Sequence, residues 1–455
     1  MTPEQRAAIA AGILVATANV SAAGNDNPHV RPSFLKGPIV SATYDGVADD
    51  LLTAGLGKTG LGSAVPPPVA VPASPTVAEL RRLAIYNNYR ALVDANKPTG
   101  GYGTLYGPNV LADGTVTAGE GKIAGDEHIV YADPGRGREN VTLMVQIPAS
   151  FDPANACIVT AASSGSRGVY GAIGTAGEWG LKRGCAVAYT DKGTGNGAHD
   201  LASNAVNLMQ GERVSALDAG TFSQFTAKLS PAALAAYNSA FPNRWAYKHA
   251  HSGNNPEQDW GRDTLRAVEF AFYMLNRQFA RGPAAARHVL TPENTIVIAS
   301  SVSNGGGAAI AAAEEDTRGL IDGVAVGEPQ VNLDAPAGLT IRRGGLAVGS
   351  MARPLYDYFT IANLYQPCAT RAPALAGSPG LFFVNAVTAA NRCAALAALG
   401  LVSGADTTAQ AEDALAKLLA AGWETDSIPF QATHYALATL SVTLTYANAY
   451  ARASV

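Results

Sequence analysis

The chain has 455 residues, of which 47% are hydrophobic and 15% are charged. This balance predicts one large, well-packed globular domain with additions, or two domains, and it excludes a disordered or highly charged protein. The net charge is −4 and Lys and Arg form no run, so we expect no nucleic-acid partner. No internal apolar segment is long enough to span a bilayer, so we expect no membrane partner either.

The N-terminus is typical of a secretory signal. Arg6 precedes an apolar stretch over residues 7–20, and the small residues 21–24 follow where a signal would be cleaved. Glu4 weakens the positive leader, which leaves an amphipathic start to a cytosolic helix as the alternative. We predict a signal peptide over residues 1–23 and a secreted, extracellular protein.

Residues 24–150 are predicted to form an N-terminal part of mixed structure. Residues 25–62 are rich in Gly, Asp, Pro and Thr, and we expect an extended leader over the domain surface. A proline-rich connector over 63–75 precedes the capping-box sequence that starts at Thr76, which predicts a helix over 77–94. The alternation of apolar residues predicts two strands, at 128–132 and 141–147.

The segment 151–345 is predicted to be an α/β core. A β-branched strand at 157–161 leads into a small-residue loop at 163–168, a helix around 172–182 and another strand at 185–189. This order requires parallel strands joined by crossover helices. A polar excursion over 190–258 interrupts the pattern, which resumes with these elements: a helix over 260–279 and strands near 296–299 and 320–326.

Strand signals nearly vanish after this core, and residues 346–455 are predicted to form a helical cap. The one strand candidate is Leu381–Val384. A helix is expected from Thr407 to Ala421, and the closing segment 435–450 is rich in Ala, Leu and Tyr. We therefore expect the sheet to be incomplete in this chain.

Four cysteines, at 157, 185, 368 and 393, show no CxxC spacing, so we expect no metal site. An even count in an exported protein permits disulfides. Cys157 and Cys185 lie in apolar strand-like runs and fit buried thiols equally well. Cys368 and Cys393 lie in loop-flanked stretches, and we predict that they form a disulfide.

Residues 295–307, TIVIASSVSNGGG, have the spacing of a nucleophile elbow, with Ser301 where a glycine usually stands. Such a turn would lift the Ser303 hydroxyl above the sheet edge, beside the N–H groups of a helix N-terminus. Ser303 is therefore the candidate nucleophile of an acyl transfer. An ordinary glycine-rich turn between a strand and a helix is the alternative.

Acyl transfer also needs an oxyanion hole. The backbone N–H of Asn304 is one candidate donor, and the loop 163–166, with Ser164, follows the first core strand at the place that α/β-hydrolases use for the other. A simple glycine turn with a surface arginine would explain this loop equally well.

Acyl transfer by serine also needs a general base, and the sequence offers two histidines to consider. His434 is the only histidine beyond Ser303, and its place at the head of an apparent helix fits capping or packing better than catalysis. His199 follows a core strand but would break the usual chain order. Acid candidates share no distinguishing context: Asp334, Asp406 and Asp426.

Several long runs resemble the 3-hydroxybutyrate oligomer hydrolases, secreted bacterial serine esterases of polyhydroxybutyrate breakdown and butanoate metabolism. These runs are residues 158–197, 259–276 and 298–309, and the similarity extends from Ser33 to Val455. The resemblance implies an α/β-hydrolase-like fold and assigns the nucleophile to Ser303. Members of that family continue for a few hundred residues and end with acid-bearing and histidine-bearing segments that do not occur here, so the chain resembles the N-terminal two-thirds of such an enzyme.

The leading hypothesis is an extracellular serine esterase that hydrolyses 3-hydroxybutyrate dimers and oligomers through an acyl-enzyme on Ser303. It implies a small-molecule ester substrate and no cofactor, and leaves the oligomeric state open. Two alternatives remain: another carboxylesterase, or a non-catalytic binding module on a hydrolase scaffold. Because only one weak strand candidate follows residue 326, we predict that Ser303 lacks a His–carboxylate pair within this chain.

Overall fold

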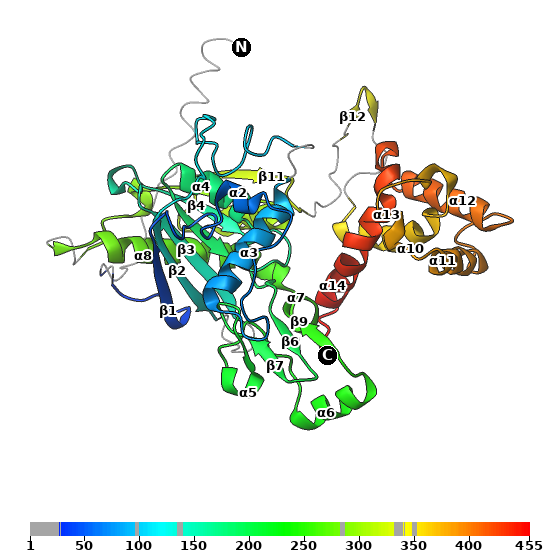
Figure 1. The fold of residues 1–455 in the computed structure, drawn as a ribbon, viewed down its shortest axis with the longest axis horizontal. Coiled ribbons are helices and arrows are strands. Elements are labelled where there is room, and N and C mark those ends of the chain that lie inside the picture. Colours follow the sequence, from blue (N-terminus) through cyan, green and yellow to red (C-terminus); the bar gives the residue numbers. More distant parts are fainter. Residues whose placement is uncertain are drawn as a thin grey trace, which may run out of the picture.

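The computed structural model describes residues 27, 29–95, 100–133, 140–282, 287–331, 340, 342–347 and 353–455. Its centre is a seven-stranded sheet with the order β1-β2-β3-β5-β4-β10-β11 (Figure 1). The strands are β1 Leu35–Tyr44, β2 Gly125–Ala132, β3 Val141–Pro148, β4 Cys157–Ala162, β5 Ala186–Thr190, β10 Ile296–Val302 and β11 Gly323–Gly327. β5, β4, β10 and β11 are parallel, whereas β1, β2 and β3 pair antiparallel. The chain is therefore α/β, with a mixed sheet.

Helices cover both faces of this sheet, which explains why every residue of β3 is buried. Leu143 and Val145 pack with residues of α8 Trp260–Phe279, and α9 Ser303–Glu315 lies beside α8. Met144 belongs instead to a second cluster, with residues of α3 Val77–Leu92 and α4 Glu178–Lys182. The alternation along β3 thus divides its side chains between two apolar layers.

The N-terminal segment differs from the leader expected over the surface. Residues 35–44 form β1, which pairs with β2 as an outer strand of the sheet. Leu51, Leu52 and Leu61 are fully buried, the last in the short helix α2 Gly57–Leu61. The prediction was wrong because the apolar residues of this segment stand among glycines and polar residues without a helical or strand periodicity that would reveal burial.

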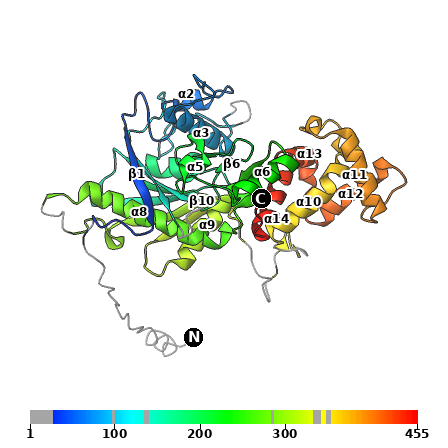
Figure 2. The same cartoon turned by 90° about the horizontal axis from the view of Figure 1, so that it is seen from below.

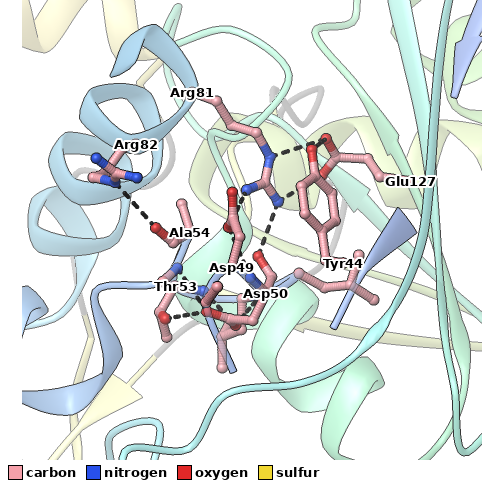
Figure 3. Close-up of polar contacts among 12 residues, drawn as sticks. Tyr44, Asp49, Asp50, Thr53, Ala54, Arg81, Arg82 and Glu127 are labelled. Atoms are coloured by element: carbon pink, nitrogen blue, oxygen red, sulfur yellow. Dashed lines mark hydrogen bonds and ion pairs between the residues drawn. The ribbon is translucent and has the colours of Figure 1, made fainter. Parts of the chain in front are cut away.

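A buried arginine joins this segment to the sheet (Figure 3). Arg81 on α3 donates to Glu127 on β2 at 3.1 Å and to Asp49 at 2.9 Å, and its guanidinium lies 3.9 Å from the centre of the Tyr44 ring. α3 itself begins with the predicted capping box between Thr76 and Glu79. A buried charge with several partners avoids the cost of an unpaired ion, so the network fixes where α3 docks.

The excursion between β5 and α8 forms a second, four-stranded sheet of order β8-β7-β6-β9. Its pairings are antiparallel, so short turns can connect neighbouring strands. The elements here are β6 Ala198–Asp200, β7 Ala205–Asn207, β8 Arg213–Ser215, α5 Ala216–Ala219, α6 Pro231–Ala240, β9 Trp245–Tyr247 and α7 Lys248–His251.

Beyond a short hairpin, the described residues from 353 onward are helical and lie to one side of the main sheet (Figures 1 and 2). The hairpin and helices are β12 Arg342–Arg343, β13 Leu346–Ala347, α10 Leu355–Ala369, α11 Ala386–Ala398, α12 Thr407–Ala420, α13 Gln431–His434 and α14 Leu440–Tyr450. The strand predicted at Leu381–Val384 is wrong, because Leu381–Phe383 form a short 3₁₀ turn with exposed phenylalanines.

Two disulfides tie the chain. The predicted bond between Cys368 and Cys393 is confirmed and joins α10 to α11. Cys157 and Cys185 also form a disulfide, which settles the choice left open between buried thiols and a bridge. The first bond lies in the apolar cluster of the helical region and the second beside the main sheet.

Helix α14 returns from the helical region to α7 at the edge of the excursion (Figure 1). Beyond it, the Gly253 N–H donates to the Ala453 carbonyl at 2.9 Å. The predicted signal peptide over residues 1–23 lies outside the described residues.

Candidate active site

The strand and the helix predicted on either side of Ser303 are both present. β10 ends at Val302 and α9 begins at Ser303, whose φ of 70° lies in the left-handed region. A non-glycine residue seldom adopts this conformation, which costs on the order of 1–2 kcal/mol. The turn leaves Ser303 exposed. Within the described ranges no group is hydrogen-bonded to its hydroxyl, so that hydroxyl is available for chemistry.

Glycines allow the close packing behind this turn. A Cβ on Gly305 would collide with the carbonyl oxygen of Ala162 at the end of β4. A Cβ on Gly307 would collide with the carbonyl oxygen of Gln330. The glycine run is therefore required by the approach of α9 to its neighbours, as its position in the sequence indicated.

The loop after β4 is bonded to the turn after β10. The Gly165 N–H donates to Oδ1 of Asn304 at 2.5 Å, and the Ser301 hydroxyl donates to the Ala162 carbonyl at 2.6 Å. Asn304 and Ser164 are 5% and 4% exposed. The N–H of Asn304, in the first turn of α9, has no acceptor within the helix. Among the described residues the Ser164 N–H also has no hydrogen-bond partner. The loop that carries Ser164 and the turn that carries Asn304 are therefore hydrogen-bonded to each other.

A buried lysine supports this loop from behind. Nζ of Lys192, which is fully buried, donates to the Gly165 carbonyl and to the Thr194 hydroxyl, both at 3.1 Å. It lies 5.1 Å from the centre of the Trp260 ring. Burial lowers the pKa of Lys192 to about 7, against a smaller opposing effect of Asp191. The lysine therefore changes charge near neutral pH, directly behind the loop.

Arg167 holds the same loop on another side. Its Nε donates to the Ser164 carbonyl at 2.5 Å and its guanidinium also reaches the Gly171 carbonyl at 2.9 Å. Burial lowers the pKa of Arg167 to about 10. Lys248, whose charge acts on Lys192, is paired with Asp191 at 2.9 Å, and both side chains are buried. The sequence identified the loop but gave no signal for these supporting contacts.

A serine–histidine contact that the sequence did not predict lies beside the loop. Oγ of Ser166 and Nδ1 of His249 are 2.6 Å apart, and the His249 ring meets the ring of Tyr446 on α14 edge to face at 5.3 Å. Burial, with the nearby charges of Lys192 and Lys248, lowers the pKa of His249 to about 3. The imidazole is therefore neutral at ordinary pH. The sequence KHAH at 248–251 belongs to no recognisable motif, so only the fold reveals this contact.

Tyr446 connects α14 to the elbow. The Asn304 side-chain amide donates to its hydroxyl at 3.4 Å, and that hydroxyl donates to Oε1 of Gln330 at 2.9 Å. The Gln330 N–H donates to the Ser303 carbonyl at 2.8 Å, and its side chain donates to Glu257 at 2.9 Å. Asn304 is thus held on one side by the loop after β4 and on the other by α14.

The histidines considered from the sequence lie elsewhere. Nδ1 of His434 is bonded to Gln366 at 2.9 Å and to Thr439 at 3.0 Å, and its ring packs against Phe359 and Trp423. His199 is bonded to Asn204 at 3.0 Å and accepts from the Ala227 N–H at 3.2 Å. Both have structural surroundings, and neither contacts Ser303.

The aspartates considered from the sequence do not contact Ser303 in the described part of the chain either. Asp406 accepts from the Ala409 N–H at 2.9 Å and caps α12. Asp426 lies in a short 3₁₀ helix, and Asp334 lies outside the described residues. In the described part of the chain, no imidazole and no carboxylate is hydrogen-bonded to the Ser303 hydroxyl. No group of three or more His, Cys, Asp and Glu side chains is arranged there to hold a metal ion.

Comparison with known proteins identifies the family. The family model described as 3HB-oligomer hydrolase matches residues 15–455. The chain belongs to the 3HB-oligomer hydrolase family. Relatives include the D-(-)-3-hydroxybutyrate oligomer hydrolase of Polaromonas naphthalenivorans strain CJ2, which is 60% identical over 440 residues, or 95% of this chain and 62% of that protein. The protein of the same name from Burkholderia thailandensis is 58% identical over 440 residues, 95% of this chain and 63% of its own length.

A third member of the 3HB-oligomer hydrolase family, from Albidiferax ferrireducens, is 58% identical over 94% of this chain and 61% of its own length. The chain therefore spans just over three-fifths of the curated relatives that it matches. No solved structure matches it. None of the helices in the described ranges combines the length and the apolar character that a membrane span requires.

Proposed function

We propose that Ser303 is the nucleophile of an extracellular serine esterase that hydrolyses short 3-hydroxybutyrate oligomers. The observation that carries this proposal is the exposed, unbonded hydroxyl of Ser303 at a left-handed turn between β10 and α9. Backbone strain is typically retained where function needs it, and an elbow presents a serine to substrate in this way. The names of the relatives supply the substrate class.

The proposed reaction has two steps. Oγ of Ser303 attacks the ester carbonyl while its proton passes to a base, and the N–H groups of Asn304 and Ser164 donate to the oxygen that becomes negative. The ester C–O bond breaks, the alkoxide takes a proton, and a hydroxy acid leaves. Water then attacks the acyl-enzyme carbonyl, and the second hydroxy acid leaves as the Ser303 hydroxyl is restored.

The sheet supports a hydrolase-type scaffold. The nucleophile strand β10 lies between β4 and β11, and β4 carries the loop that bears Ser164. We propose that this is an α/β-hydrolase-like core and that α14, through Tyr446, is part of a cap beside the site. An experimental structure in which β10 is not flanked by β4 and β11 would contradict the first part.

The decisive experiment is covalent labelling with a fluorophosphonate, which forms a phosphonate ester with an activated serine as fluoride leaves. We expect labelling of the wild-type chain and of Ser166→Ala, and none of Ser303→Ala. Ser166 is the matched control because it also lies beside the site and contacts a histidine. Release of 3-hydroxybutyrate from its dimer, compared with hydrolysis of aryl esters, then tests the substrate class. Retained labelling in Ser303→Ala would contradict the assignment.

A second candidate function is a non-catalytic binding module. It is favoured by one observation, which is that no imidazole in the described part of the chain contacts Ser303. This function predicts that the wild-type chain binds an oligomer but remains unlabelled. The same fluorophosphonate experiment, combined with a binding measurement, separates the two candidates.

Secretion is also proposed, because both disulfides suit an oxidising compartment. Deletion of residues 2–23 should keep the protein inside a bacterial host that otherwise exports it. Immunodetection in the medium and in the cell lysate measures the difference, and export of the deleted chain would refute the proposed signal.

A further inference from the structure

A cavity of about 740 Å³ opens between the excursion and helix α14. Its size is that of a typical small-molecule site. Ser166 and His249 lie at its floor, and Thr445 and Leu444 of α14 form one wall. Ser166 follows Gly165, and Thr445 precedes Tyr446, and both Gly165 and Tyr446 are bonded to Asn304. Two lining residues are therefore sequence neighbours of the residues that hold Asn304, which itself follows Ser303.

The walls of this cavity are apolar but exposed. Phe241, Trp245, Tyr247 and Leu444 are 52%, 43%, 52% and 58% exposed. Large apolar side chains that face one cavity and remain accessible are typical of a binding surface. Trp245 is held in place by Arg213, whose guanidinium lies 5.4 Å from its ring centre and which is itself paired with Asp200. These contacts fix the position of the Trp245 ring in the wall.

Arg244 adds a positive charge to this apolar surface. It lines the cavity and is exposed, and in the described ranges its side chain has no hydrogen bond and no ion pair. The other basic side chains at the cavity are imidazoles. Burial lowers the pKa of both His249 and His251, so neither adds charge at neutral pH. The cavity thus offers one cation, uncompensated by any described carboxylate, beside aromatic faces.

A 3-hydroxybutyrate oligomer has the complementary chemistry. Each unit carries a methyl group, and the chain ends in a single carboxylate. We propose that this cavity holds the acid-bearing end of the oligomer, with its carboxylate on Arg244 and its methyl-bearing units against Trp245 and Leu444. The proposal rests on the proposed function for the identity of the ligand, and it goes further by assigning a leaving-group subsite.

The direction of the ester bond decides which half occupies this subsite. In a head-to-tail polyester, the part that bears the free carboxylate is always the alcohol side of the bond that is cleaved. The bond from the carbonyl carbon to this alcohol breaks as the bond to Oγ of Ser303 forms, and the departing oxygen takes a proton. The carboxylate-bearing product therefore leaves from the cavity with Arg244, while the hydroxyl-bearing half stays on Ser303.

The test is a binding measurement that does not require turnover. In a Ser303→Ala background, the trimer of 3-hydroxybutyrate and its methyl ester are titrated by calorimetry into the full chain. We expect Arg244→Gln to weaken binding of the free acid roughly tenfold and to leave binding of the methyl ester within about twofold, because only the acid offers a charge-assisted hydrogen bond. Added salt should weaken binding of the free acid alone.

Arg183→Gln is the matched control, because Arg183 is also exposed and stacks on a tryptophan, Trp179, outside the cavity. It should leave both affinities unchanged. Trp245→Ala should weaken binding of both ligands, and unchanged melting temperatures verify folding.

Equal effects of Arg244→Gln on acid and ester, or no effect on either, would overturn the proposal. Charge-selective binding without labelling of Ser303 would refute only the esterase, and labelling without charge selectivity would refute only this subsite.

Discussion

The elbow at Ser303 and the helical region around His434 each contain a side chain of a type used in catalysis. The two side chains differ in whether their hydrogen-bonding atoms are already occupied. The Ser303 hydroxyl is exposed and unbonded within the described ranges, and its neighbour Asn304 is hydrogen-bonded to the loop that carries Ser164. His434 has its Nδ1 bonded to Gln366 and Thr439 and its ring enclosed by aromatic side chains. The difference teaches that unused hydrogen-bonding capacity at an accessible place, rather than residue type, distinguishes a candidate reactive group from a structural one.

The largest expected effect separates function from stability at the elbow. Ser303→Gly and Ser303→Ala should both lose fluorophosphonate labelling completely. Glycine tolerates a φ of 70°, whereas alanine does not, so Ser303→Gly should be more stable than Ser303→Ala by about 1 kcal/mol. Urea denaturation measures this difference. Equal stabilities would show that the turn relaxes without strain.

The second prediction concerns the helical region alone. Replacing Cys368 and Cys393 together by Ala removes a bridge between residues 25 apart and should lower the free energy of unfolding by about 3 kcal/mol. Because the bridge lies in a cluster of its own, away from the elbow, labelling of Ser303 under native conditions should persist. Loss of labelling in a variant that remains folded by circular dichroism would show that the two regions are coupled more tightly than their contacts indicate.

The third prediction tests the connection between the two regions. Asn304→Ala removes the acceptor of the Gly165 N–H and the donor to Tyr446, and leaves the half-buried N–H of Gly165 unpaired. We expect a loss of about 2 kcal/mol in stability and a slower rate of labelling at Ser303. Tyr446→Phe, which removes only the contact on the side of α14, is the matched variant and should retain most of the labelling rate. If the two variants behaved alike, the bond to the loop would have no separate role.

The smallest effect is a pH dependence from Lys192, whose folded pKa of about 7 lies below its ordinary value of 10.5. Between these values the unfolded chain binds a proton that the folded chain lacks. The free energy of unfolding should therefore rise with pH in this window, by at most about 1.4 kcal/mol per pH unit. Burial raises the pKa of the neighbouring Asp263 to about 7, so that group titrates below the window. Lys192→Met should flatten the slope between pH 7.5 and 9.5, and an unchanged slope would contradict the prediction.

Much of the fold followed from the sequence because periodicity and turn chemistry report local structure. The helix expected over 260–279 has those bounds, and the elbow strand and helix lie where the glycine run indicated. The α/β class was also predicted, whereas the hydrolase-like fold stays a proposal. The pairing of β1 with β2 was not predicted, because it depends on contacts between distant segments.

The site was predicted less completely. Ser303, Asn304 and Ser164 were predicted from one motif and its expected partner loop, and their catalytic roles stay predictions. The contacts of Lys192, His249 and Tyr446 could not be found, because each joins residues that are far apart in sequence and belongs to no local pattern. Leu381–Val384 was taken for a strand because a short apolar run fits either a strand or a turn of helix.

The bond between Asn304 and Tyr446 has a consequence for biogenesis. The two residues are separated by 142 positions, so a ribosome must add all of α10 to α13 before the elbow acquires this partner. During that interval the strand β10, the turn at Ser303 and the loop after β4 can associate, because their contacts come from residues already made. The contact of Asn304 with α14 therefore forms last. A nascent chain released before α14 is made would carry Ser303 without the contact between Asn304 and Tyr446.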